Sequence, residues 1–363
     1  MTTRWLVVAV VCLLGTVAGY SQQAGVPVFE VDPSWPRSLP NNWTFGEFSG
    51  VAVDSHDHIW INQRPKTLAD DEKYLLATPP IGDCCRPGPS IMEFDQAGNY
   101  VQGWGGPGQG FEWPENEHGV YVDDQDNVWV GGNGPKDAHI LKFTKTGRFI
   151  LQIGHLGQST GSNDTGNLNR PSKMVVNPRT NELLVSDGYG NRRVVVFDAT
   201  TGAYKRHWGA YGNRPDDSAP RALVPTGAGP QQFNLVHGLW LSKDDIVYVA
   251  DRINNRIQAF RTDGTFLREG FIARSTLGNG AAYDVALSAD PQQRFAYVPD
   301  GTNNHIWILD RATLRVLGNF GRQGRYAGQF HHSHSIAVDS KGNVYVAETQ
   351  GKRVQRFLFK GVK

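Results

Sequence analysis

The sequence predicts an all-β protein, a six-bladed β-propeller, on three observations. Glycine (42) and tryptophan (10) are abundant among the 363 residues, and no long stretch has the apolar periodicity of an amphipathic helix. One pattern, two short alternating runs joined by a tight turn, recurs six times. Most copies are followed by a third and a fourth run, so each copy describes a four-stranded antiparallel meander of about 45–70 residues, the repeat of a propeller blade.

The six copies share one register. They read "SGVAVDSHDHIWIN" from Ser49, "HGVYVDDQDNVWVG" from His118, "SKMVVNPRTNELLVSD" from Ser172, "HGLWLSKDDIVYVAD" from His237, "YDVALSADPQQRFAYVPD" from Tyr283 and "HSIAVDSKGNVYVAE" from His334. Third runs such as "RIQAFRTDG" (256–264) and fourth runs such as "NYVQGWG" (99–105) complete the blades.

An N-terminal strand is expected to close the ring. The sixth copy stops after its third strand, at Phe359, and "VPVFEVDPSWP" (26–36) has the alternation needed to supply the missing outer strand. A ring closed in this way leaves no open sheet edge, which a soluble propeller needs. The repeats are similar in style to those of NHL-type propellers.

Residues 1–24 are expected to be a signal peptide. "MTTRWLVVAVVCLLGTVAGY" has one basic residue, an apolar core and then small residues, with cleavage expected near Ala18 or Ala24. A retained membrane anchor is the alternative, but the apolar run is short for a bilayer span. We therefore expect residues 25–363 to form one secreted or periplasmic propeller domain, monomeric and free of the membrane after cleavage.

The charge balance argues against one class of partner, and the cysteine content leaves one question open. The 36 basic residues are balanced by 35 acidic ones, so no net field would hold a polyanion, and a nucleic acid is not expected as a partner. Outside the signal peptide only Cys84 and Cys85 remain. Adjacent cysteines either form a vicinal disulfide or stay unpaired, and the sequence leaves both open.

Histidine recurs at the first position of alternate blades. The six entry positions are Ser49, His118, Ser172, His237, Tyr283 and His334. In a closed ring of six blades the three histidines would lie about 120° apart and point at the axis. Three imidazoles that converge on one channel make a Zn²⁺ site with an open fourth position. The alternative is three unrelated histidines, each hydrogen-bonded to a backbone group.

A second set of residues is expected on the same face as the histidines. Arg64 and Arg252 end the second strands of blades one and four, and Tyr189 follows the second strand of blade three. Arginine binds a carboxylate bidentately, and a tyrosine beside Zn²⁺ can serve as a base. The alternatives are salt bridges between blades for the arginines and a packing role for the tyrosine. Two long insertions, 65–90 and 211–230, fall on this face and are expected to shape a binding mouth.

The motifs resemble those of peptidyl-α-hydroxyglycine α-amidating lyases, also called peptidylamidoglycolate lyases. The resemblance covers roughly residues 45–359 and rests on "SGVAVD…NQR", "HGVYVD", "VSDGYGNRRVVVF", "VHGLWL…VADRINNRIQAF" and "HSHSIAVD", in that order. It implies zinc ligands at His118, His237 and His334, a catalytic tyrosine at Tyr189 and active-site arginines at Arg64 and Arg252.

The resemblance also implies a structural Ca²⁺ ion, and here the chain departs from the pattern. The family pattern uses two backbone carbonyls, which fall on Val51 and Val120, and an aspartate directly after the third zinc histidine. This chain has Ser335 at that place, which puts calcium in doubt. His332 stands where the pattern has a methionine, so the pocket wall is altered as well.

The implied function is that of a zinc-dependent carbon–nitrogen lyase. Its substrate would be a small molecule or peptide with a C-terminal α-hydroxyglycine, and its products an amide and glyoxylate. Zn²⁺ would lower the pKa of the α-hydroxyl, Tyr189 would take its proton and an arginine would hold the carboxylate. The first alternative is the same site acting on another small hydroxy acid or ester. The second is a non-catalytic secreted propeller that binds a protein or glycan on its rim.

Overall fold

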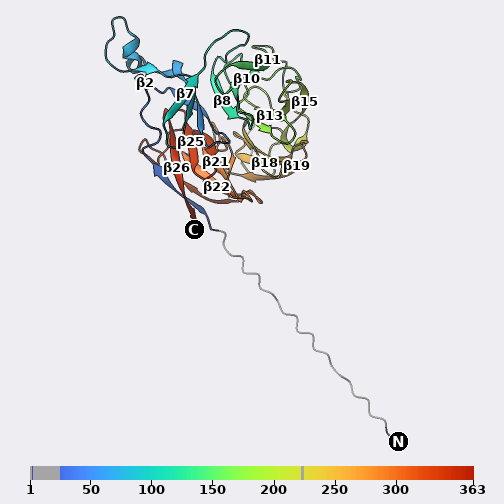
Figure 1. The fold of residues 1–363 in the computed structure, drawn as a ribbon. Helices are drawn as coiled ribbons and strands as arrows, with labels where there is room; N and C mark the ends of the chain where they lie inside the picture. The colour runs from blue at the N-terminus through green and yellow to red at the C-terminus, as the bar shows by residue number, and fades with distance from the viewer. Residues whose placement is uncertain (1, 3–24, 222–224) are drawn as a thin grey trace.

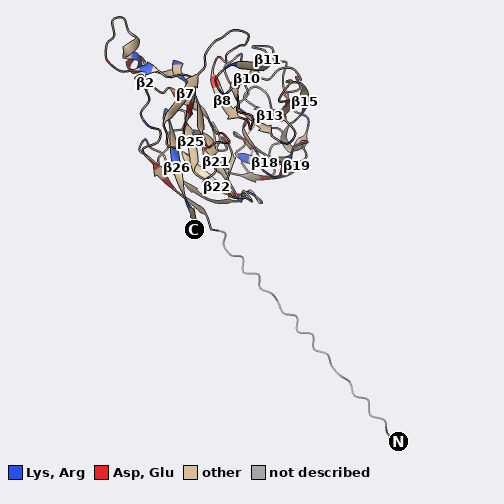
Figure 2. Ribbon diagram, viewed as in Figure 1, with Lys and Arg blue, Asp and Glu red and all other residues tan. Residues whose placement is uncertain are grey.

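The computed structural model describes residue 2, residues 25–221 and residues 225–363. The signal-peptide prediction for residues 1–24 therefore lies outside the described residues, apart from residue 2. Among the described residues, no helix combines the length and the apolar character that crossing a bilayer requires. Figure 2 shows basic and acidic residues interspersed along the chain, as the balanced composition suggests.

Six four-stranded antiparallel sheets surround a common axis, which confirms the predicted six-bladed propeller (Figure 1). The first three blades, from the innermost strand outward, are β3 (Glu47–Val53), β4 (Ile59–Arg64), β6 (Ile91–Phe94) and β7 (Tyr100–Trp104); β8 (Glu117–Val122), β9 (Asn127–Gly132), β10 (His139–Thr144) and β11 (Phe149–Gly154); and β12 (Lys173–Asn177), β13 (Glu182–Asp187), β14 (Arg193–Asp198) and β15 (Tyr204–Trp208).

The remaining blades repeat the same order. They are β16 (Val236–Leu241), β17 (Ile246–Asp251), β18 (Arg256–Arg261) and β19 (Phe266–Phe271); β20 (Ala286–Leu287), β21 (Phe295–Asp300), β22 (His305–Asp310) and β23 (Val316–Phe320); and β24 (Ser333–Val338), β25 (Val344–Glu348), β26 (Arg353–Val362) and β1 (Pro27–Asp32).

The two ends of the described chain close the ring in the sixth blade. Strand β1 pairs antiparallel with β26, so the predicted N-terminal closing strand is confirmed. The Asp32 carboxylate accepts a hydrogen bond from Arg356 Nε at 3.1 Å, and Phe29 packs edge-on against Tyr297 of the fifth blade at a centroid distance of 5.4 Å. These contacts hold the outer strand to β26 and to the fifth blade.

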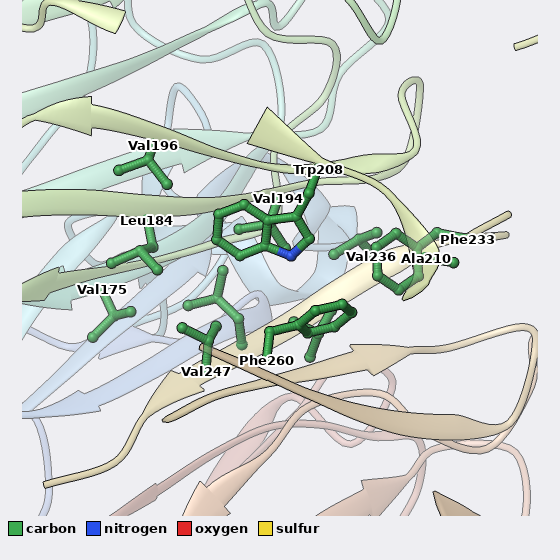
Figure 3. Packing of buried hydrophobic residues seen from close by; sticks show 12 residues of the cluster. Val175, Leu184, Val194, Val196, Trp208, Ala210, Phe233, Val236, Val247 and Phe260 are labelled. Atoms are coloured by element: carbon green, nitrogen blue, oxygen red, sulfur yellow. The ribbon is translucent and has the colours of Figure 1, made fainter. Parts of the chain in front are cut away.

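Neighbouring blades pack face to face through alternate residues of each strand. In the third blade, Val194 and Val196 face the fourth blade, where they meet Val247 and Phe260 (Figure 3). Val195, between them, faces the second blade instead. This alternation follows from the two-residue period of a strand, and it buries both faces of every blade. The runs that the sequence predicted as strands therefore belong to sheets covered on both sides.

In the fourth and sixth blades, a buried carboxylate at the end of the second strand ties the histidine-bearing strand into its blade. Asp251, at the end of β17, accepts a hydrogen bond from Arg256 Nε at 2.9 Å and another from the Asn234 N–H at 2.9 Å, just before His237. In the sixth blade Glu348 does the same, binding Arg353 Nε at 2.6 Å and the His331 N–H at 2.6 Å.

The second blade uses a different carboxylate for the same purpose. Asp137, in the turn after β9, accepts hydrogen bonds from the Glu115 and Asn116 N–H groups at 2.7 and 3.1 Å, directly before the strand with His118. Its side chain is buried, as are those of Asp251 and Glu348. The segment leading to each of the three histidines is thus fixed by charge-assisted hydrogen bonds.

Asp251→Ala is expected to lower the free energy of unfolding by about 3 kcal/mol. It leaves the fully buried Arg256 with Glu269 as its only carboxylate partner and frees a backbone N–H that had been satisfied. Urea denaturation measures the change. The matched control is Glu30→Ala, which breaks an exposed ion pair with Lys360 and should cost less than about 0.5 kcal/mol. Equal losses in the two variants would contradict this account.

Candidate metal centre

Three histidines meet on the propeller axis. His118, His237 and His334 lie in the innermost strands β8, β16 and β24, and all three are buried. Their ring centroids are 4.6 to 5.0 Å apart, and one ring nitrogen of each lies within 4.8 Å of the other two. Blades two, four and six thus bring together the three side chains that the sequence register had selected.

Each histidine is oriented by the neighbouring blade. The Nδ1 atoms of His118, His237 and His334 lie 2.9, 2.5 and 2.9 Å from the backbone oxygens of Ser172, Tyr283 and Ser49. A carbonyl oxygen only accepts hydrogen bonds, so each Nδ1 carries the proton and each Nε2 keeps its lone pair. The alternative of a histidine bound to a backbone group therefore holds for one nitrogen of each ring and leaves the other available as a ligand.

Burial keeps the three imidazoles in the neutral form that binds metals. It lowers the pKa of His118 to about 3, with the positive charge of Arg64 as the next cause. Burial is also the main reason that the pKa values of His237 and His334 fall well below the ordinary range. Neutral imidazole is the ligand form, so no proton has to be displaced from Nε2 when a metal binds.

Tyr189 places its hydroxyl among the Nε2 atoms. The oxygen lies 3.0 Å from Nε2 of His118 and 3.0 Å from Nε2 of His237. One hydroxyl proton can satisfy only one of the lone pairs that converge there. Three neutral nitrogens around one point, with an oxygen beside them, fit the donor set of a Zn²⁺ site that keeps an open position.

The turn that carries Tyr189 is pressed against the strand of His237. Tyr189 follows Asp187, the last residue of β13, after one glycine. A Cβ on Gly188 would lie 2.1 Å from the Val236 carbonyl oxygen, so only glycine fits at this approach. The motif "SDGYGNRR" therefore encodes a contact between blades three and four, and this contact sets the position of the phenol.

Arg252 completes the same cluster. Its guanidinium donates hydrogen bonds to the Tyr189 hydroxyl at 3.3 Å and the Tyr283 hydroxyl at 2.9 Å, and lies 3.8 Å from the centroid of the Tyr283 ring. Its Nε binds the Asn279 carbonyl at 2.8 Å. Within the described residues it makes no salt bridge, so the alternative role predicted for it does not hold there. A guanidinium without a carboxylate partner is suited to bind an anionic group.

Arg64 is held differently. Its Nε donates to the Glu117 carbonyl at 2.8 Å, directly before His118, and its NH1 pairs with Glu47 at 3.2 Å. Glu47 lies in the same blade as Arg64, so this ion pair does not link two blades. The hydrogen bond to Glu117 keeps the guanidinium next to the strand of His118, but part of its charge is already balanced by Glu47.

Two further residues border the cluster: Arg170, which sequence reasoning missed, and His332, which it noted only as a change in the pocket wall. Arg170 places its guanidinium carbon 5.5 Å from the centroid of the Tyr189 ring and binds the Asn133 carbonyl through Nε at 2.9 Å. The Tyr283 ring lies between Arg252 and His332. The centroids of the Tyr283 and His332 rings are 5.3 Å apart. Both Arg170 and His332 stand two residues before an entry position, a spacing that could have marked them in the sequence.

The two insertions differ in their relation to the triad. Residues 65–90 contain η1 (Pro65–Thr67), η2 (Asp70–Leu76) and β5 (Arg86–Pro87), which pairs with β2 (Trp43–Thr44), and extend away from the ring (Figure 1). The sulfur atoms of Cys84 and Cys85 lie side by side there, in keeping with the vicinal disulfide alternative. The second insertion begins near η3 (Ala210–Gly212), and its Arg221 donates to the Gly190 carbonyl at 3.2 Å, beside Tyr189.

Val51 and Val120, whose carbonyls the resemblance assigns to calcium, are buried in β3 and β8. Ser335, at the place of the expected carboxylate, donates a hydrogen bond from Oγ to Asp284 Oδ2 at 3.0 Å. The serine hydroxyl is therefore already engaged with an acidic side chain of the fifth blade.

No family model matches the chain, but curated proteins do. It is 27% identical over 93% of its length to peptidylglycine alpha-amidating monooxygenase of Rattus norvegicus, of which it spans about a third (33%). It is 23% identical over 90% of its length to the probable peptidyl-alpha-hydroxyglycine alpha-amidating lyase of Caenorhabditis elegans, covering 87% of that protein. It is 25% identical over 92% of its length to NHL repeat-containing protein 3 of Mus musculus, covering 84% of it.

Among solved structures, a streptogramin B lyase superposes with a TM-score of 0.53 at 14% identity, covering 92% of this chain and 98% of that one. This likeness concerns the fold alone. Over nine-tenths of its length, the chain is thus a distant relative both of peptidyl-α-hydroxyglycine α-amidating lyases and of NHL repeat-containing proteins.

Proposed function

We propose that the protein is a zinc-dependent carbon–nitrogen lyase that cleaves a peptidyl- or N-acyl-α-hydroxyglycine into an amide and glyoxylate. The observation that carries the proposal is the position of Tyr189, whose hydroxyl lies 3.0 Å from two imidazole Nε2 atoms and 3.3 Å from Arg252. A proton-transfer group, three neutral nitrogen ligands and an anion-binding group thus occupy one site. The names of the relatives support a lyase of this kind.

His118, His237 and His334 would hold the ion through Nε2. When bound, Zn²⁺ supplies Lewis-acid polarisation of a substrate oxygen and lowers the pKa of its hydroxyl. The remaining roles, substrate binding and proton transfer, belong to side chains of the protein. Arg252, without a carboxylate partner among the described residues, would bind the substrate carboxylate, with Arg64 and Arg170 adding positive charge around it.

The reaction balances without water or an oxidant. Tyr189 is placed to take the proton of the α-hydroxyl, the carbon–oxygen bond becomes a carbonyl and the Cα–N bond breaks. The amide nitrogen then takes up a proton, so the net change is cleavage of one bond into an amide and an aldehyde. Tyr283 and Asn279 act indirectly, because they hold the Arg252 guanidinium in place.

The proposal is tested directly by incubating the zinc-loaded protein with α-hydroxyhippurate and assaying glyoxylate and benzamide. Equal amounts of the two products are expected. The second candidate is a non-catalytic propeller, in line with a relative that is named for its NHL repeats and not for a reaction, and this candidate predicts neither bound metal nor product. Turnover of other hydroxy acids or esters, with no glyoxylate from the hydroxyglycine, would instead favour a different reaction at the same site.

Metal content gives a separate prediction. Protein purified without chelator and offered zinc should hold about one Zn²⁺ per chain, and His237→Ala should lose it, because two imidazoles are too few for a three-ligand site. Elemental analysis after desalting measures both. His155→Ala is the control, since this histidine is exposed and follows the outer strand β11, and it should keep the ion. A metal-free wild-type protein would contradict the zinc assignment.

Tyr189→Phe isolates the hydroxyl. The variant should keep the fold and the zinc but lose turnover by roughly 10²-fold or more, as expected when a positioned acid–base group is removed. Tyr204→Phe, in an outer strand, is the matched control and should leave turnover unchanged. If Tyr189→Phe retains full activity, the tyrosine has only a packing role.

A further inference from the structure

A lysine–aspartate ion pair lies on the propeller axis beside the triad. Lys173 Nζ is 2.7 Å from each carboxylate oxygen of Asp284, and the two side chains are only 7% and 3% exposed. Lys173 begins β12 in the third blade, and Asp284 precedes β20 in the fifth. The pair therefore reaches past the fourth blade and joins two blades that are not neighbours in the ring.

The pair and the triad border the same small cavity. Its lining includes His118, His237 and His334 together with Lys173, Asp284 and Ser335. The last three residues each stand one position after an entry residue: after Ser172, Tyr283 and His334. Successive residues of a strand point in different directions, so the histidines and this second set belong to two adjacent levels of one channel.

The residues at the same level in the other three blades are glycines, Gly50, Gly119 and Gly238. For Gly238 the reason is direct, because a Cβ there would lie 2.4 Å from Asp284 Oδ1 and 2.5 Å from the Asp284 Cα. The sequence "HG" in the fourth repeat thus leaves room for the carboxylate of the fifth blade. The ion pair is built into the packing of the inner strands.

The Asp284 carboxylate binds the Lys173 ammonium through both oxygens, as a carboxylate can bind a hard metal ion. Asp284 offers both carboxylate oxygens, and its Oδ2 also accepts hydrogen bonds from Ser335 Oγ at 3.0 Å and the Ile336 N–H at 3.1 Å. Its Oδ1 accepts the Val285 N–H at 2.8 Å. A buried carboxylate beside a hydroxyl is the kind of donor set that Ca²⁺ uses, but here a side-chain cation already balances the charge.

We propose that the Lys173 ammonium is a built-in cation that takes the place of a second, oxygen-bound metal ion in the axial channel. It neutralises Asp284, holds blades three, five and six around the triad and leaves the axial channel with a single metal site. Lys173 is thus a positioning residue, and the inference holds whatever reaction the triad supports. It also gives a physical reason to expect no calcium beside Ser335, where the resemblance would place the ion.

Lys173→Ala tests the proposal in the full-length, zinc-loaded protein. In calcium-free buffer its Tm should fall by several degrees, because the Asp284 carboxylate is left buried and uncompensated. Millimolar Ca²⁺ should then recover at least about half of the loss and bind at about one ion per chain in equilibrium dialysis. The wild-type Tm should move by less than about one degree under the same conditions, and dialysis should find no bound calcium.

Two variants serve as controls. Lys142→Ala removes another buried lysine, whose Nζ binds the Ala199 carbonyl at 2.9 Å, and it should be destabilised without any recovery in calcium. Lys173→Ala combined with Asp284→Ala removes the carboxylate as well and should be indifferent to calcium.

Three results would overturn the proposal. One is a wild-type protein that binds calcium or is stabilised by it. Another is a Lys173→Ala protein that calcium neither stabilises nor folds. The third is a calcium response of equal size in the Lys142→Ala control.

Discussion

The hydrogen bond from each triad histidine to the next blade is the interaction on which the site depends. The Nδ1–H groups of His118, His237 and His334 donate to carbonyl oxygens of Ser172, Tyr283 and Ser49. These bonds fix the tautomer, aim Nε2 at the axis and link blades two to three, four to five and six to one. Any change in the spacing of the blades would therefore change the geometry of the ligands. The closing strand β1 and the buried carboxylates that fix the segments leading to the histidines thus support the site as well as the fold.

The ionisable side chains along the propeller axis include neutral histidines, arginines and one paired lysine and aspartate. Burial holds the histidines neutral, three arginines contribute positive charge to the surroundings of His118, and Lys173 with Asp284 forms a neutral pair beside them. A bound dication would add further positive charge on the same axis. These charges agree with the proposed anionic substrate, for which Arg252, with no carboxylate partner among the described residues, is the proposed binding group.

The sequence predicted the blade count, the closing strand and the meeting of the three histidines, because a propeller converts a repeat register into positions around a ring. Tyr189, Arg64 and Arg252 were placed on the same face by the same register. The register could not show that Arg64 pairs with Glu47 while Arg252 lacks a carboxylate partner among the described residues, because those contacts depend on side-chain directions. Lys173 and Asp284 escaped notice for a similar reason: 111 residues separate them, and only ring closure brings them together.

The central claim is that one Zn²⁺ ion sits on the axis between the three histidines. The most direct measurement is anomalous diffraction at the zinc edge from crystals grown with one equivalent of zinc. The account predicts a single peak on the axis, about 2.0–2.1 Å from Nε2 of His118, His237 and His334, and no peak at the level of Lys173 and Asp284. An axis without a peak, or an ion bound elsewhere on the molecule, would contradict it.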